Sequence, residues 1–161
     1  MTASETAERV NAFFESYRIA FERLDAPAIA DHFAYPCHIT SDAREIVPIF
    51  VAVKEDWIGE IERLLAMYRA IGFSSARITN LIPTELSPRL VQVLVHWALH
   101  DGVGRGLYDF QAMYTLAKVN DTLQIAAIAH NEIPRYRECL ARLQSQRALG
   151  DGSPKGPHHT D

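Results

Sequence analysis

Residues 90–131 read as three consecutive β-strands joined by two short turns, and this meander limits the fold more than any other stretch. The predicted strands are residues 90–101, 106–119 and 122–131. The connections, 102–105 and 120–121, are rich in Gly, Asn and Asp, which accept turn geometry. Because both connections are short, adjacent strands must run antiparallel, and the other elements must pack around them.

The two faces of this meander have different compositions. Side chains alternate along a strand, and short hairpins keep the alternation in step from one strand to the next. One predicted face is almost wholly apolar and must be buried against helices or a second subunit. The other face is mixed, as expected of a ligand pocket or of a solvated surface. It carries His96, Asp109, Gln111, Met113, Ile128, His130 and Glu132.

Composition narrows the possible functions. The chain has 161 residues, 48% of them hydrophobic, which suits one globular domain with a real core. Its net charge of -4 comes without long charged runs, so we expect neither nucleic-acid nor membrane binding. A polar N-terminus without a signal-peptide pattern favours the cytoplasm, where Cys37 and Cys139 would be reduced thiols. No motif implies a metal or a cofactor.

Helical periodicity marks most of the remaining chain. Apolar residues at helical spacing predict helices over 4–24 and 54–71, with Gly72 ending the second. Thr2 and Glu5 have capping-box spacing, and Asp25 is placed to cap a short helix that contains Pro27. We predict further strands at 37–40, 45–53 and 74–85, and a last helix at 134–146. Pro48 argues that the strand containing it lies at a sheet edge.

This element order, with the local patterns VNAFFESYRIAFERLD, AIADHFA and YTLAKVNDTLQIAAIAHNE, resembles the NTF2-like superfamily. That superfamily includes the SnoaL-like cyclases, scytalone dehydratase and ketosteroid isomerase. The resemblance covers about residues 7–132 and implies an α+β cone, with long N-terminal helices packed in a curved antiparallel sheet around a pocket. It also implies a homodimer formed through the outer sheet face. We therefore expect one domain over 1–147 and a disordered tail over 148–161.

The resemblance also suggests roles for individual residues. Tyr17 matches the helix-one tyrosine that donates to the oxyanion in ketosteroid isomerases. Their aspartate base falls at or near Ser41, with Asp42 one position away, and this departure argues against steroid isomerisation. Their second oxyanion acid would lie on the strand over 106–119, whose only carboxylate is Asp109, although simple alignment places it nearer Gln111 or Met113.

These observations predict a pocket with two groups of residues. A histidine beside a carboxylate can act as a general acid/base, and a tyrosine can stabilise an oxyanion. The predicted catalytic residues are His96, Asp109, His130 and Tyr17. The predicted ligand-binding residues are Gln111, Met113, Ile128 and Trp57. The expected ligand is a small, largely apolar molecule with one or two polar groups. The expected activity of the protein on this ligand is that of an acid/base isomerase, cyclase or dehydratase. The alternative is a non-catalytic dimerisation, assembly or ligand-carrier domain.

Overall fold

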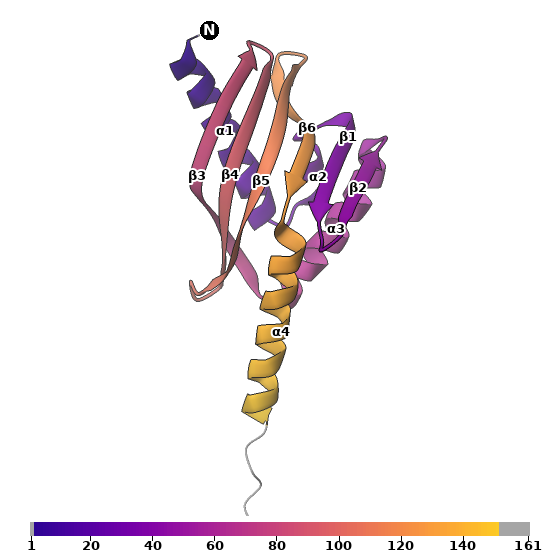
Figure 1. Ribbon diagram of the computed structural model, residues 1–161, viewed down its shortest axis with the longest axis vertical. Helices are drawn as coiled ribbons and strands as arrows, with labels where there is room; N and C mark the ends of the chain where they lie inside the picture. The colour runs from indigo at the N-terminus through magenta and orange to yellow at the C-terminus, as the bar shows by residue number, and fades with distance from the viewer. Residues whose placement is uncertain (1, 152–161) are drawn as a thin grey trace, which may run out of the picture.

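The protein folds as helices packed into the hollow of a curved six-stranded sheet (Figure 1). The computed structural model describes residues 2–151. Its elements, in chain order, are α1 (Ala3–Glu22), α2 (Ala26–Ala30), β1 (Phe33–Asp42), β2 (Ile46–Val51), α3 (Lys54–Ala70), β3 (Phe73–Ser87), β4 (Leu90–Asp101), β5 (Gly106–Val119), β6 (Thr122–His130) and α4 (Glu132–Asp151).

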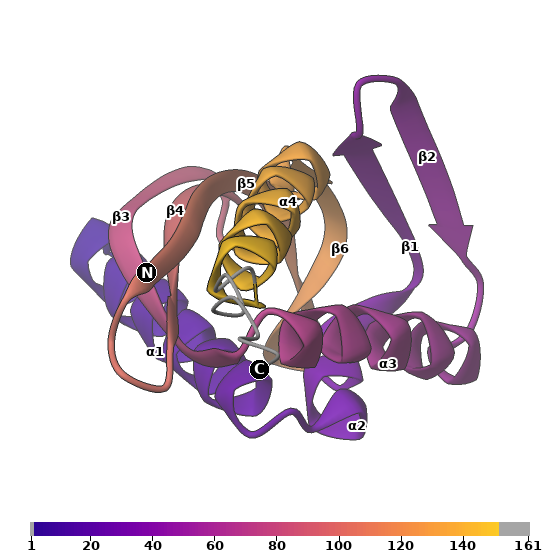
Figure 2. The ribbon, with the colours of Figure 1, turned by 90° about the horizontal axis from the view of Figure 1, so that it is seen from below.

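The strand order across the sheet is β2-β1-β6-β5-β4-β3. All neighbouring strands are antiparallel except β1 and β6, which run parallel, so the sheet is mixed. Seen from below, the sheet curls around α1, α2 and α3, and the β1–β2 hairpin extends to one side (Figure 2). The predicted α+β cone is therefore confirmed, with one parallel pair added to the antiparallel meander.

The local signals in the sequence place most of the elements correctly. Thr2 and Glu5 form both bonds of the capping box at the start of α1, and Asp25 caps α2 by accepting a bond from Ala28 N–H. Gly72 follows α3 with a positive φ of 75°, as expected of a residue that ends a helix. The strands β4 and β5 begin and end at the predicted residues.

The largest boundary differences lie at β1 and α4. β1 starts at Phe33 rather than at residue 37 and passes through Pro36. The pairing of β1 with β6 is interrupted between Phe33 and His38, so the missing proline N–H is not needed there. β2, which contains Pro48, is an edge strand as predicted. α4 runs on to Asp151, and the rest of the predicted tail lies outside the described residues.

The apolar face of the meander forms the sheet's side of the core. On β4 every second side chain, from Val91 to Leu99, is buried. Phe14 of α1 is fully buried against this face, with its ring centroid 4.9 Å from that of Tyr114. The face is thus covered by helices of the same chain. Within residues 2–151, no helix combines the length and the apolarity needed to cross a bilayer.

Removing a ring from this core should be far more costly than removing one from the surface. We expect Phe14→Ala to lower the free energy of unfolding by about 3–5 kcal/mol, because it leaves a cavity beneath β5. Phe50→Ala is the matched control, since Phe50 is 61% exposed on the edge strand β2. Its change should stay within about 0.5 kcal/mol. Urea unfolding of both variants measures the difference, and equal losses would contradict this description of the core.

Candidate active site

A cavity of about 80 Å³ lies between the hollow face of the sheet and the helices α1, α2 and α3. Its wall is mainly aromatic and aliphatic, with few polar atoms. The lining residues include Tyr17, Phe21, Ile29, Ile39, Trp57, Ile61, Leu64, Tyr68, Trp97, Phe110, Ala112, Tyr114, Ile128, His130 and Glu132. The few polar groups in such a wall decide what the cavity can do.

A bulge in β6 determines which side chains of that strand reach the cavity. The pairing of β6 with β5 slips by one residue between Ile125 and Ala127, which leaves Ala126 without a partner. Because side chains alternate, one extra residue reverses the facing of everything beyond it. Ile128 and His130 therefore join the apolar face of β5, opposite to the face predicted for them.

The other strand residues predicted for the pocket stay on the outer face of the sheet. His96 pairs with Gln111, and neither lines the cavity. Met113 is 41% exposed, and the Asp109 side chain is 75% exposed. The sorting of β4 and β5 into two faces was correct, but the cavity lies on the apolar face. The prediction that His96, Asp109, Gln111 and Met113 share a pocket with His130 is therefore wrong.

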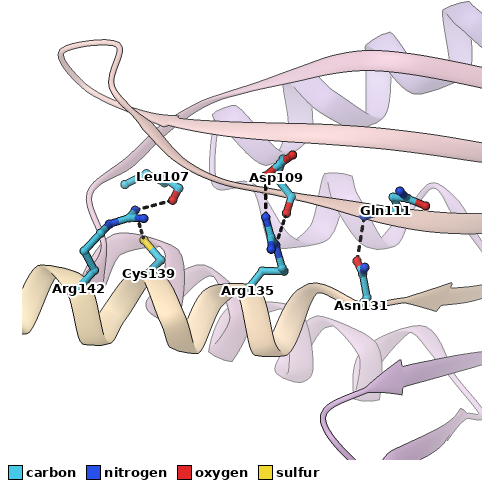
Figure 3. A network of polar contacts seen from close by, with 7 residues as sticks. All are labelled: Leu107, Asp109, Gln111, Asn131, Arg135, Cys139 and Arg142. Atoms are coloured by element: carbon cyan, nitrogen blue, oxygen red, sulfur yellow. Dashed lines mark hydrogen bonds and ion pairs between the residues drawn. The ribbon is translucent and has the colours of Figure 1, made fainter.

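Asp109 and Gln111 instead help to hold α4 against β5 (Figure 3). Arg135 donates to the backbone oxygen and to the carboxylate of Asp109, both at 2.8 Å. The Asn131 side chain, just before α4, accepts a bond of 2.9 Å from the backbone N–H of Gln111. Arg142, farther along the helix, donates to a backbone carbonyl of β5 at 2.7 Å. These contacts fix the start of α4, where the polar centre of the cavity lies.

That centre is Glu132, the first residue of α4, which is only 6% exposed. Its Oε2 accepts hydrogen bonds from the hydroxyls of Tyr68 on α3, at 2.6 Å, and Tyr108 on β5, at 2.8 Å. Its Oε1 receives neither bond. Burial raises the pKa of Glu132 to about 7, although the tyrosine bonds act in the opposite direction. Near neutral pH, Glu132 is therefore present in both the acid and the base form, as a general acid/base requires.

Little in the sequence pointed to Glu132. It falls on the predicted mixed face, but just after the predicted end of the last strand. It is the only carboxylate between Asp121 and Glu138. An isolated acid at a strand-to-helix junction was the one available signal, and its burial depends on tyrosines far away in the chain.

His130 makes structural hydrogen bonds through both ring nitrogens. Its Nδ1 accepts the backbone N–H of Glu132 at 3.2 Å, so the ring proton lies on Nε2, which is 3.0 Å from Ser41 Oγ. Burial lowers the pKa of His130, so the ring is neutral at neutral pH. His130 therefore joins β1 to the junction of β6 and α4 and helps to orient Glu132.

Two further side chains with polar atoms, Tyr17 and Trp57, line the cavity. Tyr17 is 5% exposed. Burial, with contributions from Tyr114 and Glu132, raises the pKa of Tyr17 well above 10, so its hydroxyl keeps its proton. The indole Nε1–H of Trp57 is buried and has no hydrogen-bond partner within residues 2–151. Tyr17 and Trp57, both predicted from the sequence as site residues, thus line the cavity.

The two cysteines are unsuited to nucleophilic chemistry. Both are buried free thiols. Burial raises the pKa of Cys37 to about 11 and also raises that of Cys139. Because the thiolate is the reactive form, neither residue is an activated nucleophile at neutral pH.

Comparisons with known proteins agree with the cone architecture. A family model described as an NTF2-like protein (DUF6841) matches residues 5–133. Aln2 from a Streptomyces species is 14% identical, with a TM-score of 0.66 over 89% of this chain and 99% of that one. A protein of unknown function with a cystatin-like fold from Nostoc punctiforme is 11% identical, with a TM-score of 0.64 over 81% and 92%. An NTF-2 like protein of unknown function from Shewanella oneidensis is 12% identical, with a TM-score of 0.62 over 78% and 98%.

At these identities the structural matches show the fold alone. No curated protein gives a significant match. The chemistry of the cavity therefore depends on this chain's own residues.

The raised pKa of Glu132 should make stability depend on pH. The folded state holds a proton that the unfolded chain, with an ordinary pKa of 4.5, releases as pH rises towards 7. This contribution is complete below about pH 4.5 and is lost above pH 7, on the order of 3 kcal/mol. Between pH 4.5 and 8, the free energy of unfolding of wild type should thus fall by about 3 kcal/mol more than that of Glu132→Gln, whose amide side chain has no proton to lose. Urea unfolding across this range tests it, and parallel pH profiles would contradict the assignment.

Proposed function

This chain belongs to the NTF2-like family DUF6841, and we propose that its cavity binds a small, largely apolar molecule and moves a proton on it through Glu132. The observation that carries the proposal is the carboxyl group of Glu132, buried in an apolar wall, with a pKa of about 7 and one oxygen left out of the tyrosine bonds. Such a group is rare in a core unless it has a task.

The size and lining of the cavity favour a flat ligand of about one ring. Pockets for drug-sized ligands typically measure about 300–1,000 Å³, and this cavity is far smaller, at about 80 Å³. Tyr17, Trp57, Trp97 and Tyr114 present ring faces and edges, which suit a planar apolar compound. A ligand with one carbonyl would satisfy the polar groups and leave the remaining wall in apolar contact.

The proposed reaction begins with the ionised form of Glu132. Its Oε1 takes a proton from the carbon next to a carbonyl, and the electron pair of that C–H bond moves to the carbonyl oxygen as an enolate. The Tyr17 hydroxyl donates a hydrogen bond to this oxyanion, which stabilises it in the mainly apolar cavity. When the compound has a C=C bond between its β- and γ-carbons, this bond is conjugated with the enolate. Glu132, now protonated, can then return the proton to the γ-carbon while the double bond moves to the α,β position. The net result is an isomerisation, with no change in oxidation state and no cofactor.

Related outcomes follow from the same enolate. Loss of a hydroxyl group at the neighbouring carbon, with Glu132 supplying the proton for water, gives a dehydration. Attack of the enolate carbon on a second carbonyl of the same molecule gives a cyclisation. The residues described here serve all three, so the proposed activity is an acid/base isomerase, cyclase or dehydratase acting on a small carbonyl compound.

A non-catalytic ligand-carrier or dimerisation domain is the second candidate. Ile82, Leu94 and Met113 form a row across the outer face of the sheet, and Ile82 and Met113 are more than a third exposed. An apolar row of this kind suits a homodimer built through the outer face. Association there is compatible with either function of the cavity, and we retain a cytoplasmic homodimer as part of the proposal.

Exchange of carbonyl-adjacent protons tests the chemistry without knowledge of the natural substrate. In D₂O, the protein should catalyse deuterium incorporation into the methyl group of acetophenone, followed by ¹H NMR. We expect the rate to fall by about 10²–10⁴ in Glu132→Gln, which lacks the base, and by about 10² or more in Tyr17→Phe, which lacks the oxyanion donor. The wild-type rate should rise with pH through about 7, as Glu132 ionises.

His96→Gln is the control, because His96 lies on the outer face of the sheet, away from the cavity. It should exchange protons at the wild-type rate. Binding of acetophenone without any exchange would rule out the acid/base proposal and favour the ligand carrier.

A further inference from the structure

The two tryptophans of the cavity wall differ in one respect. Trp97 Nε1–H donates to the hydroxyl of Tyr114 at 2.9 Å and is satisfied within the protein. Trp57 Nε1–H is also buried but has no partner within residues 2–151. Native proteins leave few buried donors unpaired, and those that remain commonly meet a ligand or an ordered water. The fold therefore provides a hydrogen-bond acceptor for the indole N–H of Trp97 and none for that of Trp57.

Trp57 and Glu132 lie near opposite ends of the stripe that α3 contributes to the cavity wall. α3 lines the cavity with a stripe at helical spacing that starts at Trp57 and ends at Tyr68, which donates to Glu132. Eleven residues of α-helix span about 16 Å at about 1.5 Å per residue. Figure 2 shows the same path, with α3 running from the side of the β1–β2 hairpin to the region beneath α4.

A ladder of aromatic rings follows the same path. The ring centroids of Trp57 and Phe33 are 5.4 Å apart, and those of Phe33 and Tyr17 are 6.1 Å apart. From Tyr17 the ladder continues through Phe21, at 5.0 Å, to Tyr68, at a further 6.0 Å. Four of these five rings, all but Phe33, line the cavity of about 80 Å³, and we call the space beside them the slot. Its wall is mainly apolar, with Trp57 and Glu132 toward its two ends.

Within residues 2–151, no acceptor lies within hydrogen-bond distance of the Trp57 indole N–H. Ile29 of α2, Ile39 of β1 and Ile61 of α3 line the cavity together with Trp57, and their side chains carry no oxygen or nitrogen. A ligand that reaches this end must itself bring the acceptor.

We infer that Trp57 is a specificity-determining residue that selects rod-like, single-ring carbonyl compounds carrying a second acceptor oxygen at the end remote from the reacting carbonyl. This inference rests on the proposed function, which puts the carbonyl at the Glu132 end. An ether, a hydroxyl or a second carbonyl meets the requirement, because each presents a lone pair to the indole N–H. A hydrocarbon of the same shape fills the slot but leaves the donor unpaired.

Two para-substituted acetophenones of equal length test the inference. 4-Methoxyacetophenone carries an ether oxygen where 4-ethylacetophenone carries a methylene group. Titration calorimetry should show that wild type binds the methoxy compound about fivefold more tightly, as expected for one net hydrogen bond. In Trp57→Phe the ratio should fall to about one through loss of methoxy affinity, while the affinity for the ethyl compound stays within about twofold.

Ile61→Val is the matched control, since it alters the same end of the wall without touching a donor. It should keep the fivefold ratio. A ratio near one in wild type, or a ratio unchanged in Trp57→Phe, would overturn the inference. The wild-type comparison stands even where the Trp57 variant fails to fold.

Methyl-proton exchange, measured by NMR on the same samples, separates this inference from the proposed function. A Trp57-dependent preference without exchange would overturn the acid/base chemistry and support the role of Trp57 in binding. Exchange that depends on Glu132, without any preference for the ether, would overturn the role of Trp57 alone. Failure of both compounds to bind would overturn both.

Discussion

The site depends on keeping one carboxyl group out of water at the point where β6 becomes α4. Glu132 accepts hydrogen bonds there from the hydroxyls of Tyr68 on α3 and Tyr108 on β5. A single side chain therefore links α3, the sheet and α4. The same burial that sets this geometry also sets the pKa, because a charge without solvent is costly. Structure and acid/base character therefore have one physical origin.

Local patterns in the sequence were enough to place most of the elements, while the cone architecture followed from the resemblance to the NTF2-like superfamily. Capping residues, helical stripes and turn dipeptides act over a few residues, so their effects can be read directly, as at Thr2, Asp25 and Gly72. The bulge at Ala126 is different, because it is visible only in the pairing of β6 with β5. A stretch of small and branched apolar residues fits either register. The facing of Ile128 and His130 followed from that choice and not from their own chemistry.

The mistaken residues of the predicted site have a common cause. Polar side chains such as His96 and Asp109 attract attention in a sequence, yet on a sheet packed against helices they are stable mainly on the wet side. Besides His130 and Glu132, the residues with polar atoms that line the cavity are ones normally counted as core, such as Tyr17, Trp57 and Tyr68. In a dry pocket, an aromatic side chain contributes its apolar body to the wall and its O–H or N–H to the ligand. Counting these groups as potential ligand contacts would have pointed to the correct face.

The placement of the two tryptophans also gives the molecule an optical property. Trp57 and Trp97 are the only tryptophans in the sequence, and both line the cavity. Indole emission responds to the polarity and quenching groups of its surroundings, so all of this protein's tryptophan fluorescence originates at the pocket wall. The chain thus carries a built-in, label-free reporter, and libraries of small carbonyl compounds can be screened against it by emission alone.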